Sequence, residues 1–184
     1  MSAHPKFIPA SSQTVGPFFS IGLDYLAERS PAMDAGAAGN LTIRGRVLDR
    51  DGAPVPDAIL EFRNGAATRD SSASEDGFPE GFRRTATDEE GIFSVVMRRP
   101  PEVELEDGRV QAPHMLVLVF MRGLLRHLIS RVYFESDAGI GTDPVLLAIP
   151  PERRRTLIAQ RHGENSYRWD VILQGTDETV FFAW

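Results

Sequence analysis

The chain has 184 residues, of which 42% are apolar and 25% charged, with a formal net charge of −6 and no cysteine. This length and composition fit one globular domain and are short for two. The net negative charge, with no run of like charge longer than Arg153-Arg154-Arg155, argues against a nucleic-acid partner, which requires clustered Lys and Arg. The absence of cysteine excludes disulfides, thiolate nucleophiles and cysteine metal sites.

The first 40 residues are predicted to form an N-terminal arm. Gly16-Pro17 prevents a regular helix or a central strand at that point, and Phe18 and Phe19 follow directly. Because two exposed phenylalanines would be unfavourable, we expect the arm to dock onto another surface. A short helix is expected over 23–29 and a loop over 30–40. Residues 1–8 lack the basic-then-apolar order of a signal peptide, so we expect a cytoplasmic protein.

From residue 41 onward the sequence indicates short β-strands. Leu41, Ile43 and Val47 alternate with polar residues, which is the period of a half-buried strand. Further strands are expected at 58–63, 92–98, 167–174 and 179–184, with turns at 49–52 and 89–91 and loops at 64–82 and 102–111.

The run from Met115 to Met121 is predicted to be the central strand of the core. Its seven apolar residues are too few for a membrane helix, which needs about 20. Arg122-Gly123 indicates a turn and 124–134 a returning strand, which together make a hairpin. A first strand with almost no polar face has to be covered on both sides, so we expect the rest of the chain to wrap around it.

Pro150-Pro151-Glu152 predicts the start of a helix through Arg161, because proline and a carboxylate both suit a first helical turn. Short strands, many turns and little helix together predict an all-β chain. The expected architecture is an antiparallel β-sandwich over 41–184, with one or two short helices and the arm over 1–40.

The residues alone do not reveal a self-contained active site. None of the four histidines forms a pair at metal-ligand spacing, so structural or surface roles are expected for them. No phosphate-binding loop or nucleophile elbow is present in the sequence. Arg122, at the tip of the apolar hairpin, either binds a carboxylate in a cleft or is an ordinary turn residue, and these residues do not decide between the two.

Several stretches resemble, in order and over nearly the whole length, the intradiol ring-cleaving dioxygenases. They are Ser12-Gln13-Thr14-Val15-Gly16-Pro17-Phe18-Phe19, Phe82-Arg83-Arg84-Thr85-Ala86-Thr87, Ala112-Pro113-His114, Phe120-Met121-Arg122-Gly123, Arg131-Val132-Tyr133-Phe134, the segment 154–161, Tyr167-Arg168-Trp169-Asp170 and the ending 175–184. The resemblance implies a prealbumin-like sandwich and a role in aromatic catabolism. Its best fit is the α-type chain of a two-chain enzyme that cleaves protocatechuate with dioxygen to 3-carboxy-cis,cis-muconate.

In that family two tyrosines and two histidines hold a ferric ion, and hard phenolate oxygens suit Fe(III). This sequence departs from the pattern. Of the two family histidines only His114 remains, since the second position is Leu116. One tyrosine position falls at 101–103 and the other near Asp70, and neither place has a tyrosine. A charge-compensating arginine of the family is Gln111 here. The resemblance therefore implies no metal in this chain and Fe(III) in a homologous β subunit.

The resemblance also implies that the arm and the hairpin arginine close the partner's substrate pocket. The residues carried over are Thr14, Gly16, Pro17, Phe18 and Arg122, and Phe18 stands where many relatives have tyrosine. The expected assembly is an (αβ)n hetero-oligomer that binds an aromatic carboxylate and O2, with no nucleic-acid or membrane partner. The alternative is a transthyretin-like binding module without a catalytic partner. A homodimeric catechol dioxygenase is nearly excluded, because one ligand-type residue of four remains.

Overall fold

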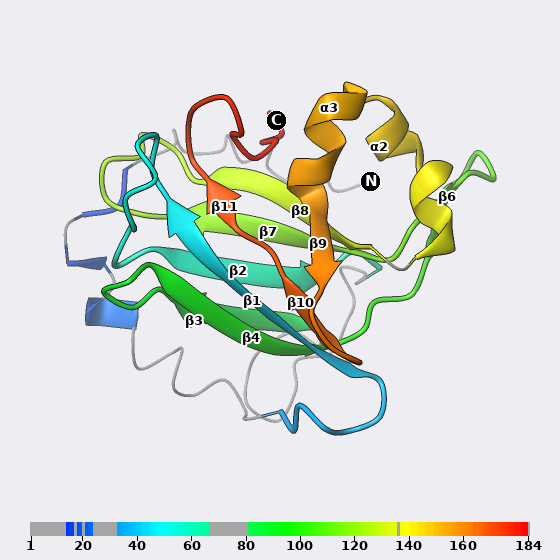
Figure 1. Ribbon diagram of the computed structural model, residues 1–184, viewed down its shortest axis with the longest axis horizontal. Coiled ribbons are helices and arrows are strands. Elements are labelled where there is room, and N and C mark those ends of the chain that lie inside the picture. The colour runs from blue at the N-terminus through cyan, green and yellow to red at the C-terminus, as the bar shows by residue number, and fades with distance from the viewer. Residues whose placement is uncertain are drawn as a thin grey trace, which may run out of the picture.

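The computed structural model describes residues 14–16, 18–19, 21–23, 33–66, 81–135 and 137–183. These residues are mainly β-structure with a few short helices (Figure 1). The strands are β1 (Asn40–Leu48), β2 (Ile59–Asn64), β3 (Phe82–Ala86), β4 (Ile92–Arg98), β5 (Val103–Glu104), β6 (Val110–Gln111), β7 (His114–Phe120), β8 (Leu128–Phe134), β9 (Ile158–Arg161), β10 (Ser166–Arg168) and β11 (Val171–Ile172). The helices are η1 (Ala138–Gly141), α2 (Pro144–Leu147), α3 (Pro151–Arg154) and η2 (Arg155–Leu157).

One curved sheet accounts for most of the strands in the described ranges. Its order is β11-β1-β10-β9-β8-β7-β2-β3, with β4 on the other edge of β1, while β5 and β6 form a separate small pair. Figure 1 shows β7, β8 and β2 lying behind β1, β10 and β11. The two ends approach each other, since the Thr85 hydroxyl on β3 donates to the Ser94 carbonyl on β4 at 3.1 Å. The sheet is therefore nearly closed.

Pairing in this sheet is mixed rather than purely antiparallel. β2, β3, β4, β7 and β8 pair in the antiparallel sense, whereas β1 runs parallel to β10 and β11, and β8 runs parallel to β9. The prediction of an all-β chain is confirmed. The prediction of an antiparallel arrangement is wrong for the three parallel pairings, β1 with β10, β1 with β11 and β8 with β9.

The core lies inside the curve of the sheet. The alternation read from the sequence is confirmed, because Leu41, Ile43 and Val47 on β1 are buried. Phe93 on β4 lies with its ring centroid 5.9 Å from that of Phe62 on β2, which joins the two layers. Burying a side chain of this size stabilises the fold by about 1.5–3 kcal/mol.

The predicted central hairpin is present as β7 and β8, but its second strand begins at Leu128 rather than at residue 124. On β7, Met115, Val117 and Val119 are fully buried, whereas Leu116, Leu118 and Phe120 are half-buried. The expectation that this strand is completely covered is therefore correct for one face only.

Three other expectations differ from the structure. The predicted helix from 150 to 161 ends early, because α3 and η2 lead into β9, whose Ile158 and Ala159 pair with Tyr133 and Phe134. Pairing with a distant strand has overridden the local helical signal. The predicted loop over 102–111 contains the β5–β6 pair, and β3 begins at Phe82, the last residue of the predicted loop over 64–82.

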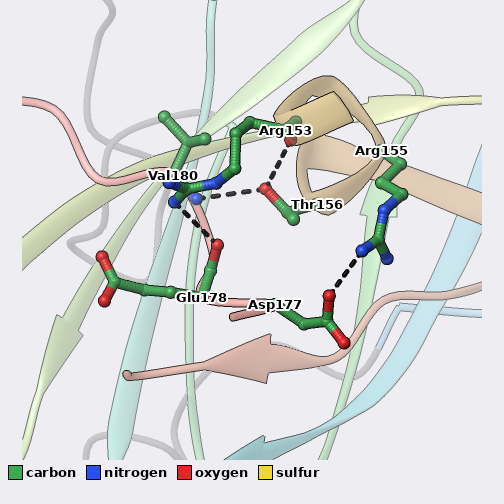
Figure 2. Close-up of polar contacts among 6 residues, drawn as sticks. All are labelled: Arg153, Arg155, Thr156, Asp177, Glu178 and Val180. Atoms are coloured by element: carbon green, nitrogen blue, oxygen red, sulfur yellow. Dashed lines mark hydrogen bonds and ion pairs between the residues drawn. The ribbon is translucent and has the colours of Figure 1, made fainter. Parts of the chain in front are cut away.

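Where the structure describes it, over 179–183, the strand predicted at 179–184 is instead an extended tail held partly by side chains (Figure 2). The Thr156 hydroxyl accepts from Val180 N at 3.1 Å and donates to Arg153 O at 2.8 Å. Arg153 donates to Glu178 O at 3.0 Å. The tail does not continue a regular ladder, although Phe182 N donates to Ile129 O at 2.8 Å.

In the parts of the chain that the structure describes, no helix has the length and apolar character needed to cross a membrane.

A close backbone approach at Gly45 shapes the sheet around β1. Trp169 N donates to Arg44 O at 3.0 Å where β10 ends and β11 has not begun. A Cβ added at Gly45 would lie 1.7 Å from Trp169 O and 2.7 Å from Trp169 C. Both are backbone atoms, so only a glycine fits at this position.

We expect Gly45→Ala to lower the free energy of unfolding by about 1–3 kcal/mol, because the new methyl group forces β1 away from Trp169. Urea denaturation followed by tryptophan fluorescence measures the change. Gly141→Ala is the matched control, since a Cβ at Gly141 meets no atom within 4 Å. Equal stability of Gly45→Ala and the parent chain would contradict the prediction.

Candidate functional site

The tip of the β7–β8 hairpin is the first candidate site. The buried strand β7 ends at Phe120, and the connection that follows carries Arg122, whose side chain is exposed. Gly123 has φ +90°, a backbone conformation that residues with a Cβ rarely adopt. The apolar strand therefore fixes the base of the turn, and the glycine lets the chain reverse directly after Arg122.

The N-terminal arm meets this tip. The Thr14 hydroxyl donates to Leu124 O at 2.6 Å, joining two residues 110 positions apart. A small cavity of about 50 Å³ is lined by Val15, Phe120, Met121, Leu124, Arg126 and His127. Of the five predicted site residues, the structure thus brings Thr14 to the connection that carries Arg122. Gly16 and Phe18 are exposed on the arm, and Pro17 lies outside the described residues.

Large apolar side chains are exposed on both segments that Thr14 joins. Phe18 is 74% exposed and Ile21 68% exposed on the arm, and Leu125 is 82% exposed on the hairpin connection. Exposed apolar groups of this size, when they gather, mark surfaces that contact another molecule. Within the described residues Phe18 does not pack against its own chain, so the surface on which it is predicted to dock is not part of these residues.

The second candidate site surrounds His114 at the other end of β7. The imidazole is buried, and its Nδ1 lies 2.8 Å from Ala112 O. Because a carbonyl oxygen only accepts, Nδ1 carries the proton in this contact. Gly65 covers the far side of the ring, where an added Cβ would lie 2.4 Å from Nε2. Burial lowers the pKa of His114, so the ring is held in its neutral form.

Asp143 organises the polar groups beside His114. This fully buried carboxylate is the N-cap of α2 and accepts from Val145 N and Leu146 N, both at 2.9 Å. It also accepts from Ala112 N at 2.8 Å and from the Tyr133 hydroxyl at 3.3 Å. These four contacts satisfy a charge that would otherwise be costly to bury.

Tyr133 and Arg131 extend this network. The Tyr133 ring lies 5.3 Å from the His114 ring. Arg131 donates to the Tyr133 hydroxyl at 3.3 Å and to Gln111 Oε1 at 3.2 Å. Burial raises the pKa of Tyr133 to about 12, so its hydroxyl stays protonated and neutral.

Two of the positions aligned with the family's iron ligands, His114 and Leu116, lie on β7. Val103 on β5 pairs with Gln111 on β6, and Gln111 leads to Arg131. Leu116 projects on the same face of β7 as His114 and offers no lone pair. The Asp70 position lies outside the described residues. In the described ranges no three His, Cys, Asp or Glu side chains are grouped to hold a metal ion. The residues that are described here therefore do not fit a ferric ion.

Sequence reasoning missed the Asp143 network. The Asp143-Pro144 pair carried a signal, because aspartate followed by proline is typical of the first residues of a helix. The links to Ala112 and Tyr133 depend on the tertiary fold and have no local signature in the sequence.

Comparisons with known proteins give a consistent result. The sequence model of the family described as Dioxygenase matches residues 16–175. The chain is 42% identical to the protocatechuate 3,4-dioxygenase alpha chain of Burkholderia cepacia, covering 93% of this chain and 95% of that one. It is 36% identical to the protein of the same name from Pseudomonas putida, covering 93% of this chain and 94% of that one.

A similar solved structure is that of 3-chlorocatechol 1,2-dioxygenase from Rhodococcus opacus 1CP. Its TM-score is 0.58 at 20% identity, covering 91% of this chain and 68% of that one. At this level of identity the likeness concerns the fold alone.

The raised pKa of Tyr133 predicts a loss of stability at alkaline pH. In the unfolded chain tyrosine ionises near pH 10.0, whereas the folded chain keeps Tyr133 neutral until about pH 12. The contribution of Tyr133 to the free energy of unfolding is complete below pH 10. It falls by about 1.4 kcal/mol per pH unit between the two pKa values. We expect Tyr133→Phe to remove this part of the dependence of the free energy of unfolding on pH. Urea denaturation of both proteins across this range measures it, and an identical slope in the two would contradict the prediction.

Proposed function

The chain belongs to the intradiol dioxygenase family, and we propose that it is the subunit that shapes the substrate pocket of an iron-bearing partner. The proposed reaction is that of its relatives by name, the 3,4-dioxygenation of protocatechuate, with 3-carboxy-cis,cis-muconate as the product. The observation that carries the proposal is the 2.6 Å hydrogen bond from Thr14 to Leu124 O, because it places the arm beside the connection of Arg122.

The proposal assigns the iron to a homologous β subunit. When bound there, Fe(III) holds the catechol and makes it reactive toward dioxygen. In this chain, His114 donates through Nδ1 to Ala112 O, and Gly65 packs against Nε2, so neither ring nitrogen is directed at a vacant ligand position. Leu116, which stands in place of a family histidine, also supports assigning the iron to the β subunit.

Arg122 is proposed to bind the carboxylate of the substrate. Its guanidinium is exposed at the end of a strand whose inner face is fully buried, so the group is well placed to enter a neighbouring subunit's cleft. A charge-assisted hydrogen bond of this kind contributes about 1.5–3 kcal/mol. Thr14, Gly16, Pro17 and Phe18 are proposed to form the wall beside it. The Thr14 hydroxyl donates to Leu124 O, which leaves its lone pairs free to accept.

The β subunit is proposed to cover Phe18, Ile21 and Leu125. Their exposure of 68% or more on the arm and the hairpin connection supports an interface there. The (αβ)n assembly, the cytoplasmic location and the prealbumin-like sandwich belong to the same proposal. The last of these is supported by the two layers of the sheet that meet through Phe62 and Phe93.

Metal analysis of the chain alone and with its partner tests whether the β subunit binds the iron. The purified chain should hold no stoichiometric iron and consume no oxygen with protocatechuate. Co-expressed with a β subunit that carries the two tyrosines and two histidines, it should co-purify, gain iron and turn over protocatechuate. Stoichiometric iron in the lone chain would overturn the proposal, and a chain that recruits no β subunit would favour the binding-module alternative.

We expect Arg122→Ala to weaken protocatechuate binding in the assembled enzyme by about 1.5–3 kcal/mol, because the substrate carboxylate loses its cation. The effect should appear in KM and be absent for catechol, which has no carboxylate. Arg98→Ala is the control, since it removes the same charge from an exposed residue on β4 rather than on the hairpin connection. Unchanged affinity for protocatechuate in Arg122→Ala would make Arg122 a turn residue only.

We expect Leu125→Asp to weaken association with the β subunit, because a charge enters a surface that the partner would desolvate. Size-exclusion chromatography of the mixed subunits measures the fraction assembled. Leu147→Asp is the matched control, since Leu147 is a leucine that is 52% exposed on α2, away from the arm and the hairpin connection. Equal assembly of the two variants would argue against an interface at the tip.

A further inference from the structure

Three arginines gather on the outer face of the sheet, away from the site proposed above. Arg44 and Arg46 are both exposed on β1, two residues apart, so their side chains share one face at a spacing of about 6.7 Å. Arg168 on the parallel strand β10 is the register partner of Arg44, and adjacent strands lie about 4.8 Å apart. Neighbouring strands thus bring three guanidinium groups into one small area.

Only part of this positive charge is compensated. Arg168 forms an ion pair with Asp170 at 3.1 Å, and the other oxygen of Asp170 accepts from the backbone N of Arg46 at 3.0 Å. Among the described residues, the side chains of Arg44 and Arg46 have no hydrogen bond or ion pair. Like charges in register on adjacent strands destabilise a sheet. A chain with a net charge of −6 therefore carries an unfavourable cluster of cations here.

The cluster borders a cavity of the size of a ligand site. Its volume is about 540 Å³, within the range of about 300–1,000 Å³ typical of small-molecule pockets. It is lined by Arg44, Gly45, Arg46, Ile92, His162, Ser166, Tyr167 and Arg168. The three guanidinium groups in this lining suit a small anionic ligand.

We propose that this groove binds a small organic anion with two or three carboxylates. A guanidinium pairs with a carboxylate through two parallel hydrogen bonds, and Arg44 and Arg46 each have this capacity unused. Their spacing along β1 lets each guanidinium take a separate carboxylate of one molecule. His162 and Ser166 add polar groups at the rim for a third carboxylate or a hydroxyl.

Two sources share this chemistry. One is a general polycarboxylate of the cell, for which citrate is the probe. The other is the ring-opened product of the proposed reaction, which carries three carboxylates. Only this second possibility rests on the proposed function. Titration of the purified full chain at low ionic strength, by calorimetry and thermal shift, compares citrate, 3-carboxy-cis,cis-muconate and acetate.

We expect one molecule of at least one tricarboxylate to bind per chain, with no binding of acetate at the same concentration. Tighter binding of the muconate than of citrate would identify the product as the ligand, and equal binding a general polycarboxylate. Arg44→Gln should weaken binding about tenfold or more. It should also raise the melting temperature of the ligand-free chain, because the repulsion from Arg168 is removed.

Arg98→Gln is the matched control. Arg98 is exposed on the same outer face, at the end of β4, and does not line the cavity. It should bind tricarboxylates as the parent chain does. Failure of both tricarboxylates to bind, or equal binding by Arg44→Gln, would overturn the proposal. Neither result bears on the proposed function, since the titration uses no partner, and Arg44→Gln should leave turnover of the assembled enzyme unchanged.

Discussion

The register of the β7–β8 hairpin is the constraint on which both candidate sites depend. It runs from His114 opposite Tyr133 to Val119 opposite Leu128, and the inner side chains of the hairpin are fully buried. A seven-residue strand is about 23 Å long, so His114 at the base and Arg122 beyond the tip are about that far apart. His114, the position aligned with a family ligand, and Arg122, the position proposed to touch the partner's substrate, are therefore too far apart to form one site. This separation makes it physically consistent for a chain to lose the first role and keep the second.

The buried polar groups at the base of the hairpin are partnered by groups of the same chain. A buried histidine needs a partner for its N–H, which Ala112 O supplies, and a neutral ring, which burial favours. The buried Asp143 carboxylate is satisfied by three backbone N–H groups and the Tyr133 hydroxyl. The His114 N–H and the Asp143 carboxylate thus both have partners within the chain.

The sequence predicted the elements whose signals are local. The alternation in β1 and β4, the apolar run of β7 and the turn at Gly123 depend on residues close together in the chain, and they are confirmed. β9 was predicted as helix because its pairing partners, Tyr133 and Phe134, lie more than 20 residues earlier. The tail after Thr179 has strand-like residues, but its hydrogen bonds are divided between side chains such as Thr156 and isolated backbone partners such as Ile129 O, so no regular ladder forms. The sequence did not decide whether Arg122 binds a carboxylate or is an ordinary turn residue. The contact between Thr14 and Leu124 brings the arm to the connection that carries Arg122, and no short sequence motif predicts this contact.

One glycine links the inner and outer faces of the sheet. Because Gly45 has no Cβ, the Trp169 backbone comes close to β1, and the chain changes course between β10 and β11. On the inner side this approach lets Trp169 join the core, where its indole N–H donates to Thr156 O at 2.9 Å. On the outer side it leaves Asp170 bonded to the Arg46 backbone and paired with Arg168. The single acidic group of the cluster is thereby fixed to one of the three arginines. Arg44 and Arg46 remain without a counter-charge among the described residues, and it is this imbalance, produced by the fold itself, that a ligand of opposite charge would relieve.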